Sequence, residues 1–357
     1  MKPTFLTPHF SPLSSDQSLD RSGMSQHLKS WGDQVQRGWK NGSQITDQAQ
    51  PPRLLVWAGM GGSAIGGDFC ASLFHERSTF PLLVHRGGTL PTWLGNEDRL
   101  IAVSFSGNTA ETLYAAERAY KRGVAVDVLT SGGKLAQWAV EQGIKPWIVP
   151  GGRPPRTALG DLFAFAFGTC CARGWLKEVE GELEETREII RQRTDEFSLP
   201  PSGSSSPLAS LQQILSERLA MVYSWGRLIP VARRWACQFN ENAKLPAHWG
   251  ELPEMNHNEV VAYFKDSPGA KKYAVIFLND PDGENEMQQR VDCTSRMARE
   301  VGWETMVVEP SAKTPIAKML ELTVMGDWLS YWMALARGID PTPIAPIDQL
   351  KIMMESR

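Results

Sequence analysis

One stretch constrains the fold of this chain more than any other: residues 100–112, LIAVSFSGNTAET. Its first four residues form an apolar run typical of a buried strand. A turn rich in hydroxyl groups follows, and then the apolar spacing of a helix, with Asn108 and Glu111 placed as an N-terminal capping pair. Strand, turn and helix in this order build parallel sheets, so the stretch predicts an α/β protein.

The turn within this stretch has the composition of an anion site. Ser104, Ser106 and Thr109 supply hydroxyl groups, and the backbone N–H groups at a helix N-terminus favour a negative charge. The turn contains no Lys or Arg, whereas a nucleotide P-loop needs its Lys on the outer phosphates. We therefore expect a small phosphorylated metabolite. A capped strand–helix turn with solvated serines is the alternative.

A glycine-rich turn follows an earlier apolar run. Residues 53–58 predict a buried strand, and GMGGSAIGGD comes directly after it. Ser63 lies in this turn, and Gly61 and Gly62 would let the backbone bend tightly and approach a ligand closely.

The same glycines match a loose dinucleotide-binding fingerprint. That motif requires an acidic residue after the next strand, which we predict at residues 81–84. His85 and Arg86 follow that strand instead. The acidic residue is missing, although an Arg could suit a 2′-phosphate, so a dinucleotide site stays open as an alternative.

Apolar strand patterns alternate with helical patterns over the first half of the chain, at residues 53–58, 81–84, 100–103, 125–130 and 146–149. This alternation predicts a parallel sheet with helices on both faces. Ligands of such sheets lie beyond the carboxyl ends of the strands. We therefore expect Ser63, the turn at residues 104–109, the turn at Ser131 and Arg156 at one edge.

The alternation of strand and helix patterns restarts after LPPSGSSSP, whose composition is typical of a linker. We predict an N-terminal domain at residues 1–198 with a leading helix at residues 24–39, a linker at residues 199–207, and a C-terminal domain of the same α/β kind at residues 208–357.

The second domain repeats the strand–turn–helix plan of the first, but its turn is acidic. After the strand at residues 273–279 stand Asp280, Asp282 and Glu284. Carboxylates would repel a phosphate, so we expect one phosphate site.

Composition narrows the function classes. With 357 residues, 22% of them charged, and a net charge of −3, the chain has no basic excess for nucleic acid or for a membrane surface. Its five cysteines have neither disulfide-framework nor zinc spacing and are expected to be buried thiols. The first residues lack the apolar run of a signal peptide, so a cytoplasmic protein is expected.

Acid–base residues gather in the segment QFNENAKLPAHWGELPEMNHNEVVAY of the second domain. Glu241 and His257 beside a phosphate site would suit proton transfer on a sugar phosphate. A metal site built from Glu254, His257 and Glu259 is an alternative, although a second nearby His and the HExxH spacing are missing. A plain surface glutamate and turn histidine are the other alternative.

Five motifs of the sequence resemble one family: GMGGSAIGGD, VSFSGNTAET, PPRTALG, ENAK with PEMNHNE, and DPTPIAPIDQLK. They are similar to those of the bifunctional phosphoglucose/phosphomannose isomerases, over residues 53–351. The resemblance implies two sugar isomerase (SIS) domains, each a flavodoxin-like sandwich. It also implies an aldose–ketose isomerase that converts glucose 6-phosphate and mannose 6-phosphate to fructose 6-phosphate as a homodimer, with no cofactor and no metal.

The resemblance also assigns roles to residues. It implies phosphate binding by Ser63, Ser104, Ser106 and Thr109, with backbone contacts from Gly61 and Gly62. It implies an active-site arginine at Arg156, a proton-transfer base at Glu241, and a ring-opening pair at His257 and Lys351, with the histidine reaching into the partner's site. Phe105 stands where the family commonly has a Tyr.

Two other functions fit SIS domains. A non-catalytic sugar-phosphate sensor would usually carry a DNA-binding domain, and residues 1–50 show no basic helix-turn-helix pattern. The isomerase half of an enzyme that makes glucosamine 6-phosphate would accompany a glutaminase domain with an N-terminal cysteine, which is not evident here. Another phosphosugar isomerase also stays open.

Overall fold

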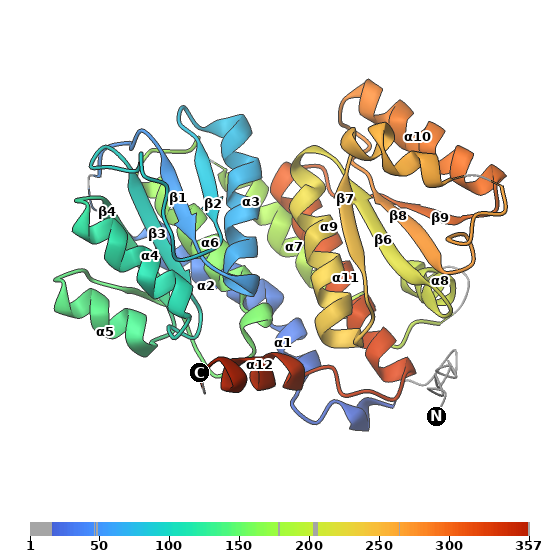
Figure 1. Cartoon of the computed structure of the whole chain (residues 1–357), viewed down its shortest axis with the longest axis horizontal. Coiled ribbons are helices and arrows are strands. Elements are labelled where there is room, and N and C mark those ends of the chain that lie inside the picture. The colour runs from blue at the N-terminus through green and yellow to red at the C-terminus, as the bar shows by residue number, and fades with distance from the viewer. Residues whose placement is uncertain are drawn as a thin grey trace. The chain divides into compact units, whose positions relative to one another are not determined.

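The computed structural model describes residues 16–45, 47, 49–177, 179–202, 206–263 and 265–355 (Figure 1). Its internal contacts form two units. The N-terminal unit is Ser30–Arg187, and the C-terminal unit joins the residues up to Lys29 with those from Glu188 onward. The boundary between them falls inside α7, Glu180–Phe197. The domain limits expected from the sequence stay predictions.

The N-terminal unit is built on a fully parallel five-stranded sheet in the order β2-β1-β3-β4-β5. This is the strand order of flavodoxin-like folds, and it confirms the predicted fold class. The strands are β1 (Leu55–Ala58), β2 (Leu82–His85), β3 (Arg99–Ser104), β4 (Ala125–Thr130) and β5 (Trp147–Ile148).

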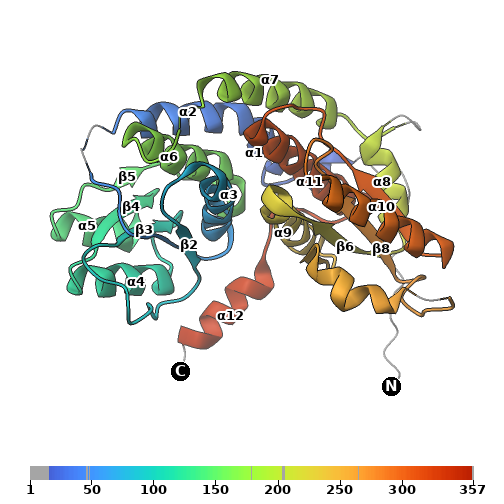
Figure 2. The same cartoon turned by 90° about the horizontal axis from the view of Figure 1, so that it is seen from above.

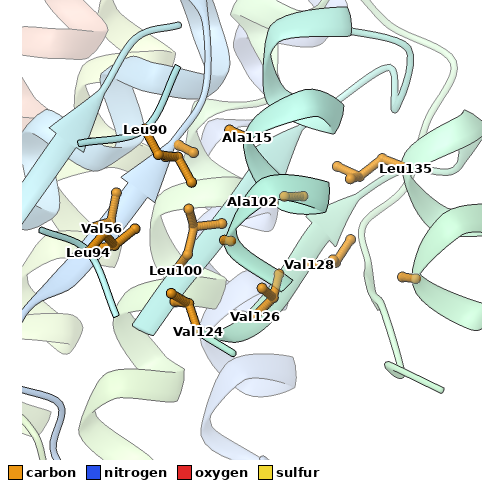
Figure 3. Packing of buried hydrophobic residues seen from close by; sticks show 14 of the residues in the cluster. Val56, Leu90, Leu94, Leu100, Ala102, Ala115, Val124, Val126, Val128 and Leu135 are labelled. Atoms are coloured by element: carbon orange, nitrogen blue, oxygen red, sulfur yellow. The ribbon is translucent and has the colours of Figure 1, made fainter. Parts of the chain in front are cut away.

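Helices cover both faces of this sheet (Figures 1 and 2). One face carries α3 (Gly61–Arg77) and α6 (Leu159–Ala172), and the other carries α4 (Ala110–Lys121) and α5 (Gly133–Glu141). Figure 3 shows the core beneath α4 and α5, where Val56, Ala102 and Val128 of the strands meet Ala115 and Leu135 of the helices. All five side chains are buried, so this face of the sheet is sealed from water.

A further helix, α2 (Trp31–Ser43), packs tightly along α6. At Gly42 a Cβ atom would lie 2.1 Å from the carbonyl oxygen of Phe165, so a glycine is required for this approach. The leading helix expected at residues 24–39 is wrong as one element. It breaks at Ser30, the N-cap of α2, and its first part is α1 (Met24–Lys29) in the C-terminal unit.

The C-terminal unit has a parallel four-stranded sheet in the order β7-β6-β8-β9, the same plan without the last strand. Its strands are β6 (Leu219–Ser224), β7 (His248–Glu251), β8 (Tyr273–Leu278) and β9 (Glu304–Val308). The sequence did not indicate β7, because this edge strand has mostly exposed residues and no apolar run.

Helices α9 (Ile229–Gln238) and α10 (Asn285–Glu300) pack on the second sheet, and α11 (Pro315–Ala336) packs against α9 (Figure 1). Two further helices are α8 (Pro207–Leu215) and α12 (Ala345–Glu355). Nearly all of α11 is buried, which explains why it is apolar on every side. Among the described residues, no helix combines the length and the apolarity needed to cross a lipid bilayer.

All five cysteines are free thiols. Cys70 and Cys170 are buried, and burial raises the pKa of both. The expectation of buried thiols is wrong for Cys237 and Cys293, which lie on exposed positions of α9 and α10.

Candidate active site

The hydroxyl-rich turn joins β3 to α4. The Ser104 hydroxyl donates to Thr109 Oγ1 at 2.9 Å, and Thr109 is the N-cap residue of α4. The predicted capping by Asn108 is therefore wrong. Asn108 Oδ1 instead accepts a hydrogen bond from the backbone N–H of Lys134 at 3.2 Å, because the start of α5 lies against this turn.

One glycine, Gly107, fixes the shape of the turn. Gly107 has φ +67°, and a Cβ atom there would lie 1.7 Å from the carbonyl oxygen of Gly132. No other residue fits this contact. Beside it, the Ser131 hydroxyl donates to the carbonyl of Phe105 at 2.6 Å. The turns after β3 and β4 therefore support each other.

The glycine-rich turn after β1 meets the same edge of the sheet. Ser63, expected in that turn, lies in the first turn of α3. The backbone N–H of Phe105 donates to Ser63 Oγ at 3.0 Å, which confirms that the two segments lie together. Within the part of the chain that the structure describes, the hydroxyl hydrogens of Ser63, Ser106 and Thr109 donate to no protein atom. A hydroxyl can donate and accept together, so all three can still donate to an anion.

The structure places Arg156 beside the glycine-rich segment after β1, as the sequence predicts. It lies in a short 3₁₀ helix, Pro155–Thr157, and is 3% exposed. A Cβ atom at Gly62 would lie 3.1 Å from the Cα of Arg156, so the glycine permits this close packing. Gly61, with φ +49°, begins α3, and the N–H groups at the start of a helix have no carbonyl partner within the helix.

A second arginine, Arg153, was not identified from the sequence. Its guanidinium carbon lies 5.7 Å from the centre of the Phe105 ring, and the group is paired with Asp161. Asp161 also accepts two hydrogen bonds from Arg37, at 2.9 and 2.8 Å. Burial, with the charge of Arg37, lowers the pKa of Arg153 to about 10, so it stays cationic near neutrality. Arg37 and Arg153 share the single carboxylate of Asp161. A net positive charge therefore remains next to the hydroxyl-rich turn, which contains no Lys or Arg.

The dinucleotide alternative depended on Arg86 after β2. The guanidinium of Arg86 is paired with Asp68 of α3. The residue that could have held a 2′-phosphate is therefore engaged within the protein, which weighs against that alternative.

Glu241 lies in the C-terminal unit, on a π-helical turn, Phe239–Ala243, that continues α9. Lys244 ends the turn with φ 54°, and its ammonium group donates to the backbone carbonyl of Glu241 and, at 3.1 Å, to that of Pro341. Asn242 Nδ2 donates to Ser330 Oγ at 2.9 Å. Such turns occur frequently at functional sites. Here the turn holds Glu241 half-buried on a fixed backbone.

A buried ion pair fixes the helix that leads into this turn. Arg234 of α9 donates to both carboxylate oxygens of Asp327 in α11, at 3.0 and 2.7 Å. Gln238 Nε2 donates to the same carboxylate at 2.9 Å. All three side chains are buried. The position of Glu241 therefore depends on contacts to α11.

His257 ends a 3₁₀ helix, Glu254–His257, and is exposed. Its imidazole makes no hydrogen bond or ion pair to any residue in the described ranges. Lys351 lies on α12 with its ammonium group 4.0 Å from Asp348 Oδ1. Glu241, His257 and Lys351 thus stand on three separate elements of the C-terminal unit, whereas the hydroxyl turn and Arg156 belong to the N-terminal unit.

The acidic turn of the C-terminal unit is neutralised internally. The ammonium group of Lys318 donates to Asp280 at 2.5 Å and to Asp282 at 2.7 Å. These carboxylates stand where the N-terminal unit has hydroxyl groups, and their partner comes from α11. The ammonium group offsets the charge by which these carboxylates would repel a phosphate, so the single phosphate site stays a prediction.

The metal alternative required Glu254, His257 and Glu259. Glu254 accepts a hydrogen bond from Asn258 at 3.0 Å, and Glu259 accepts one from Tyr223. Among the residues with described positions, no group of three His, Cys, Asp or Glu side chains is arranged to hold a metal ion. The absence of a metal stays an expectation.

Two flavodoxin-like units, one with a hydroxyl turn at its switch point, define a double-SIS protein. The family model described as bacterial phospho-glucose isomerase C-terminal SIS domain matches residues 204–354. A bifunctional phosphoglucose/phosphomannose isomerase of Aquifex aeolicus is 31% identical over 309 residues, covering 86% of this chain and 92% of that protein. The chain belongs to the family of bifunctional phosphoglucose/phosphomannose isomerases.

Two further comparisons agree with this assignment. The protein of the same name from Caldicellulosiruptor bescii is 29% identical over 322 residues, covering 89% of this chain and 95% of that one. Among solved structures, the C-terminal domain of glucosamine-fructose-6-phosphate aminotransferase from Francisella tularensis has a TM-score of 0.70 at 14% identity, covering 90% of this chain and 98% of that one. The second likeness shows the fold alone.

Proposed function

We propose that this chain is an aldose–ketose isomerase that interconverts glucose 6-phosphate and mannose 6-phosphate with fructose 6-phosphate. One observation carries the proposal: relatives named bifunctional phosphoglucose/phosphomannose isomerase match nearly the whole chain. The hydroxyl turn supports it, because its geometry leaves donors free for a phosphate group.

In this proposal the N-terminal unit holds the phosphate. Ser63, Ser106 and Thr109 donate to its oxygens, and Ser104 orients Thr109 through the hydrogen bond between their hydroxyls. Hydrogen bonds to a charged group contribute roughly 1.5–3 kcal/mol each. Arg153 adds positive charge behind Phe105, which compensates for the lack of a cation within the turn.

The C-terminal unit supplies the acid–base chemistry. Glu241 takes the proton from C2 of the open-chain aldose, and the released electron pair forms a cis-enediolate. Return of that proton to C1, with transfer of the O2 hydroxyl proton to O1, gives the ketose. Arg156 stabilises the negative charge that develops on oxygen. His257 and Lys351 move protons on the ring oxygen and on the hydroxyl oxygens. Side chains of the protein supply every step, so we expect no cofactor.

The direct test is an assay of purified protein with each aldose phosphate, coupled to a reaction that consumes fructose 6-phosphate. We expect product from both glucose 6-phosphate and mannose 6-phosphate, because the family name covers both C2 epimers. Binding of both sugars without conversion of either would instead identify a non-catalytic sensor.

Free buried thiols support a reducing, cytoplasmic location.

We further propose a homodimer in which His257 completes the site of the partner subunit. The exposed imidazole, which no described side chain of its own chain engages, supports this arrangement. Mixing His257→Ala protein with Glu241→Gln protein should then restore up to about a quarter of wild-type activity, because random exchange makes half of the dimers mixed and leaves one whole site in each.

Activity after mixing is measured once mass spectrometry of differently labelled chains has verified subunit exchange. A control mixture of His257→Ala with wild-type protein should show only dilution of activity. If verified exchange restores none, each chain completes its own site.

A further inference from the structure

A buried tyrosine reaches the His257 segment from inside the second sheet. Tyr223 of β6 is 2% exposed and packs in an apolar cluster with Met255 and Phe277. Its hydroxyl donates to the carboxylate of Glu259, two residues after His257. Burial raises the pKa of Tyr223 far above its ordinary value, with Tyr263 and Glu259 acting in the same direction. The hydroxyl therefore stays protonated and donates near neutral pH.

The phenol ring of Tyr223 is itself held in place. A Cβ atom at Gly250 of β7 would lie 2.6 Å from Tyr223 Cε1 and 2.8 Å from Cδ1. The ring thus packs directly on the backbone of the neighbouring strand, which only a glycine allows. Because the ring cannot shift toward β7, its hydroxyl offers a fixed point of attachment for Glu259.

A second tether holds the segment on the other side of His257. Asn256 Nδ2 donates to Thr294 Oγ1 of α10 at 2.8 Å. Asn258 Nδ2 donates to Glu254 at 3.0 Å, which closes the segment on itself. The polar neighbours of His257 are thus all engaged in holding the backbone.

His257 differs from these neighbours. It is exposed, and within the described part of the chain its imidazole has no hydrogen-bond partner. A tethered backbone that presents one free imidazole is what a proton-transfer residue needs, since a misplacement of about 1 Å can cost about 10²-fold in rate.

We propose that Tyr223 is a positioning residue for the isomerase reaction: through Glu259 it holds the segment that presents the His257 imidazole to the sugar ring. This inference rests on the proposed function, because it takes His257 as a ring-opening residue. Tyr223 itself touches no substrate in this arrangement.

Tyr223→Phe removes the hydroxyl and keeps the ring in the core. We expect kcat to fall roughly 10-fold to 100-fold, while KM, set by the hydroxyl turn of the other unit, changes by less than about twofold. The matched control is Tyr331→Phe, the same change at a fully buried tyrosine outside this cluster. It should leave both constants near wild type. Thermal melting verifies that each variant is folded.

Glu259 gives the same test without touching the core. Glu259→Gln keeps an oxygen that can accept from Tyr223, so its kcat should stay within about threefold of wild type, whereas Glu259→Ala should match Tyr223→Phe. Hydrogen exchange of backbone amides at residues 254–263 should be faster in Tyr223→Phe and Glu259→Ala than in Tyr331→Phe. Equal exchange in all three would overturn the inference.

A double variant separates positioning from general structural damage. If Tyr223 acts through His257, Tyr223→Phe/His257→Ala should be no slower than His257→Ala alone, because His257→Ala has already removed the group that Tyr223 positions. Multiplication of the two losses would overturn the inference.

Two outcomes distinguish failure of the proposed role of His257 from failure of the positioning role of Tyr223 alone. Wild-type kcat in His257→Ala would reject the proposed role of His257 and the positioning role with it. A slow His257→Ala beside a Tyr223→Phe that behaves like Tyr331→Phe would reject the positioning role only.

Discussion

Replacing Glu241 by Gln is expected to lower kcat by roughly 10²–10⁴-fold while KM for the sugar phosphate changes little. The amide has the size and hydrogen-bonding reach of the carboxylate but cannot take a carbon-bound proton. The substrate is held by the hydroxyl turn of the N-terminal unit, which this change does not touch. Steady-state kinetics of purified, folded protein with glucose 6-phosphate measures both constants.

The matched control for this variant is Glu300→Gln, the same chemical change at the exposed last residue of α10. Its activity should stay within about twofold of wild type, and its stability within roughly 0.5 kcal/mol. The Glu241→Gln protein should still bind a sugar-phosphate hydroxamate that mimics the enediolate. If its kcat matched that of Glu300→Gln, Glu241 would be a surface residue and the mechanism would be wrong.

The interior strands were the most predictable part of the fold. The strand expected at residues 125–130 is β4 with the same bounds, and residues 100–103 lie within β3. Strands inside a parallel sheet are buried on both faces, so they appear as unbroken apolar runs. Their order could not be derived from such runs, but the α/β alternation limited it to a small set.

The edge strand β7 and the break between α1 and α2 were less predictable from the sequence. β7 has only one neighbour and exposes most of its side chains, so its sequence carries no apolar signal. The break between α1 and α2 at Ser30 interrupts a continuous helical pattern. The two helices then pack in different units, which tertiary contacts decide and local propensity does not.

In the candidate site, the sequence could predict which residues share an edge but not how they contact one another. Ser63 follows β1, and Ser104 ends the neighbouring parallel strand β3, so topology alone brings them to one edge. Arg153 lies only a few residues from Arg156, yet its position over the Phe105 ring depends on how the loop after β5 folds back. The expected cap at Asn108 failed because α5, distant in sequence, engages that side chain.

The buried ion pair that fixes the helix leading to Glu241 gives the second prediction with a large expected effect. Asp327→Ala is expected to lower the free energy of unfolding by about 3–5 kcal/mol, the usual cost of breaking a buried ion pair. Asp327 is 0% exposed, and its carboxylate accepts from Arg234 and Gln238. Removing it leaves the buried Arg234 guanidinium without this carboxylate to offset its charge. Urea denaturation followed by tryptophan fluorescence measures the loss.

An exposed pair of the same residue types provides the control. Asp195 lies 3.4 Å from Arg191 on α7, with both side chains largely in water, so Asp195→Ala should change stability by less than about 1 kcal/mol. A loss in Asp327→Ala no larger than this would mean that the remaining surroundings of Arg234 offset its charge without Asp327. Because α9 continues into the turn that carries Glu241, the Asp327→Ala protein should also lose kcat at temperatures where it remains folded. Full activity in that folded protein would show that the turn, through Asn242 and Ser330, holds Glu241 without the ion pair.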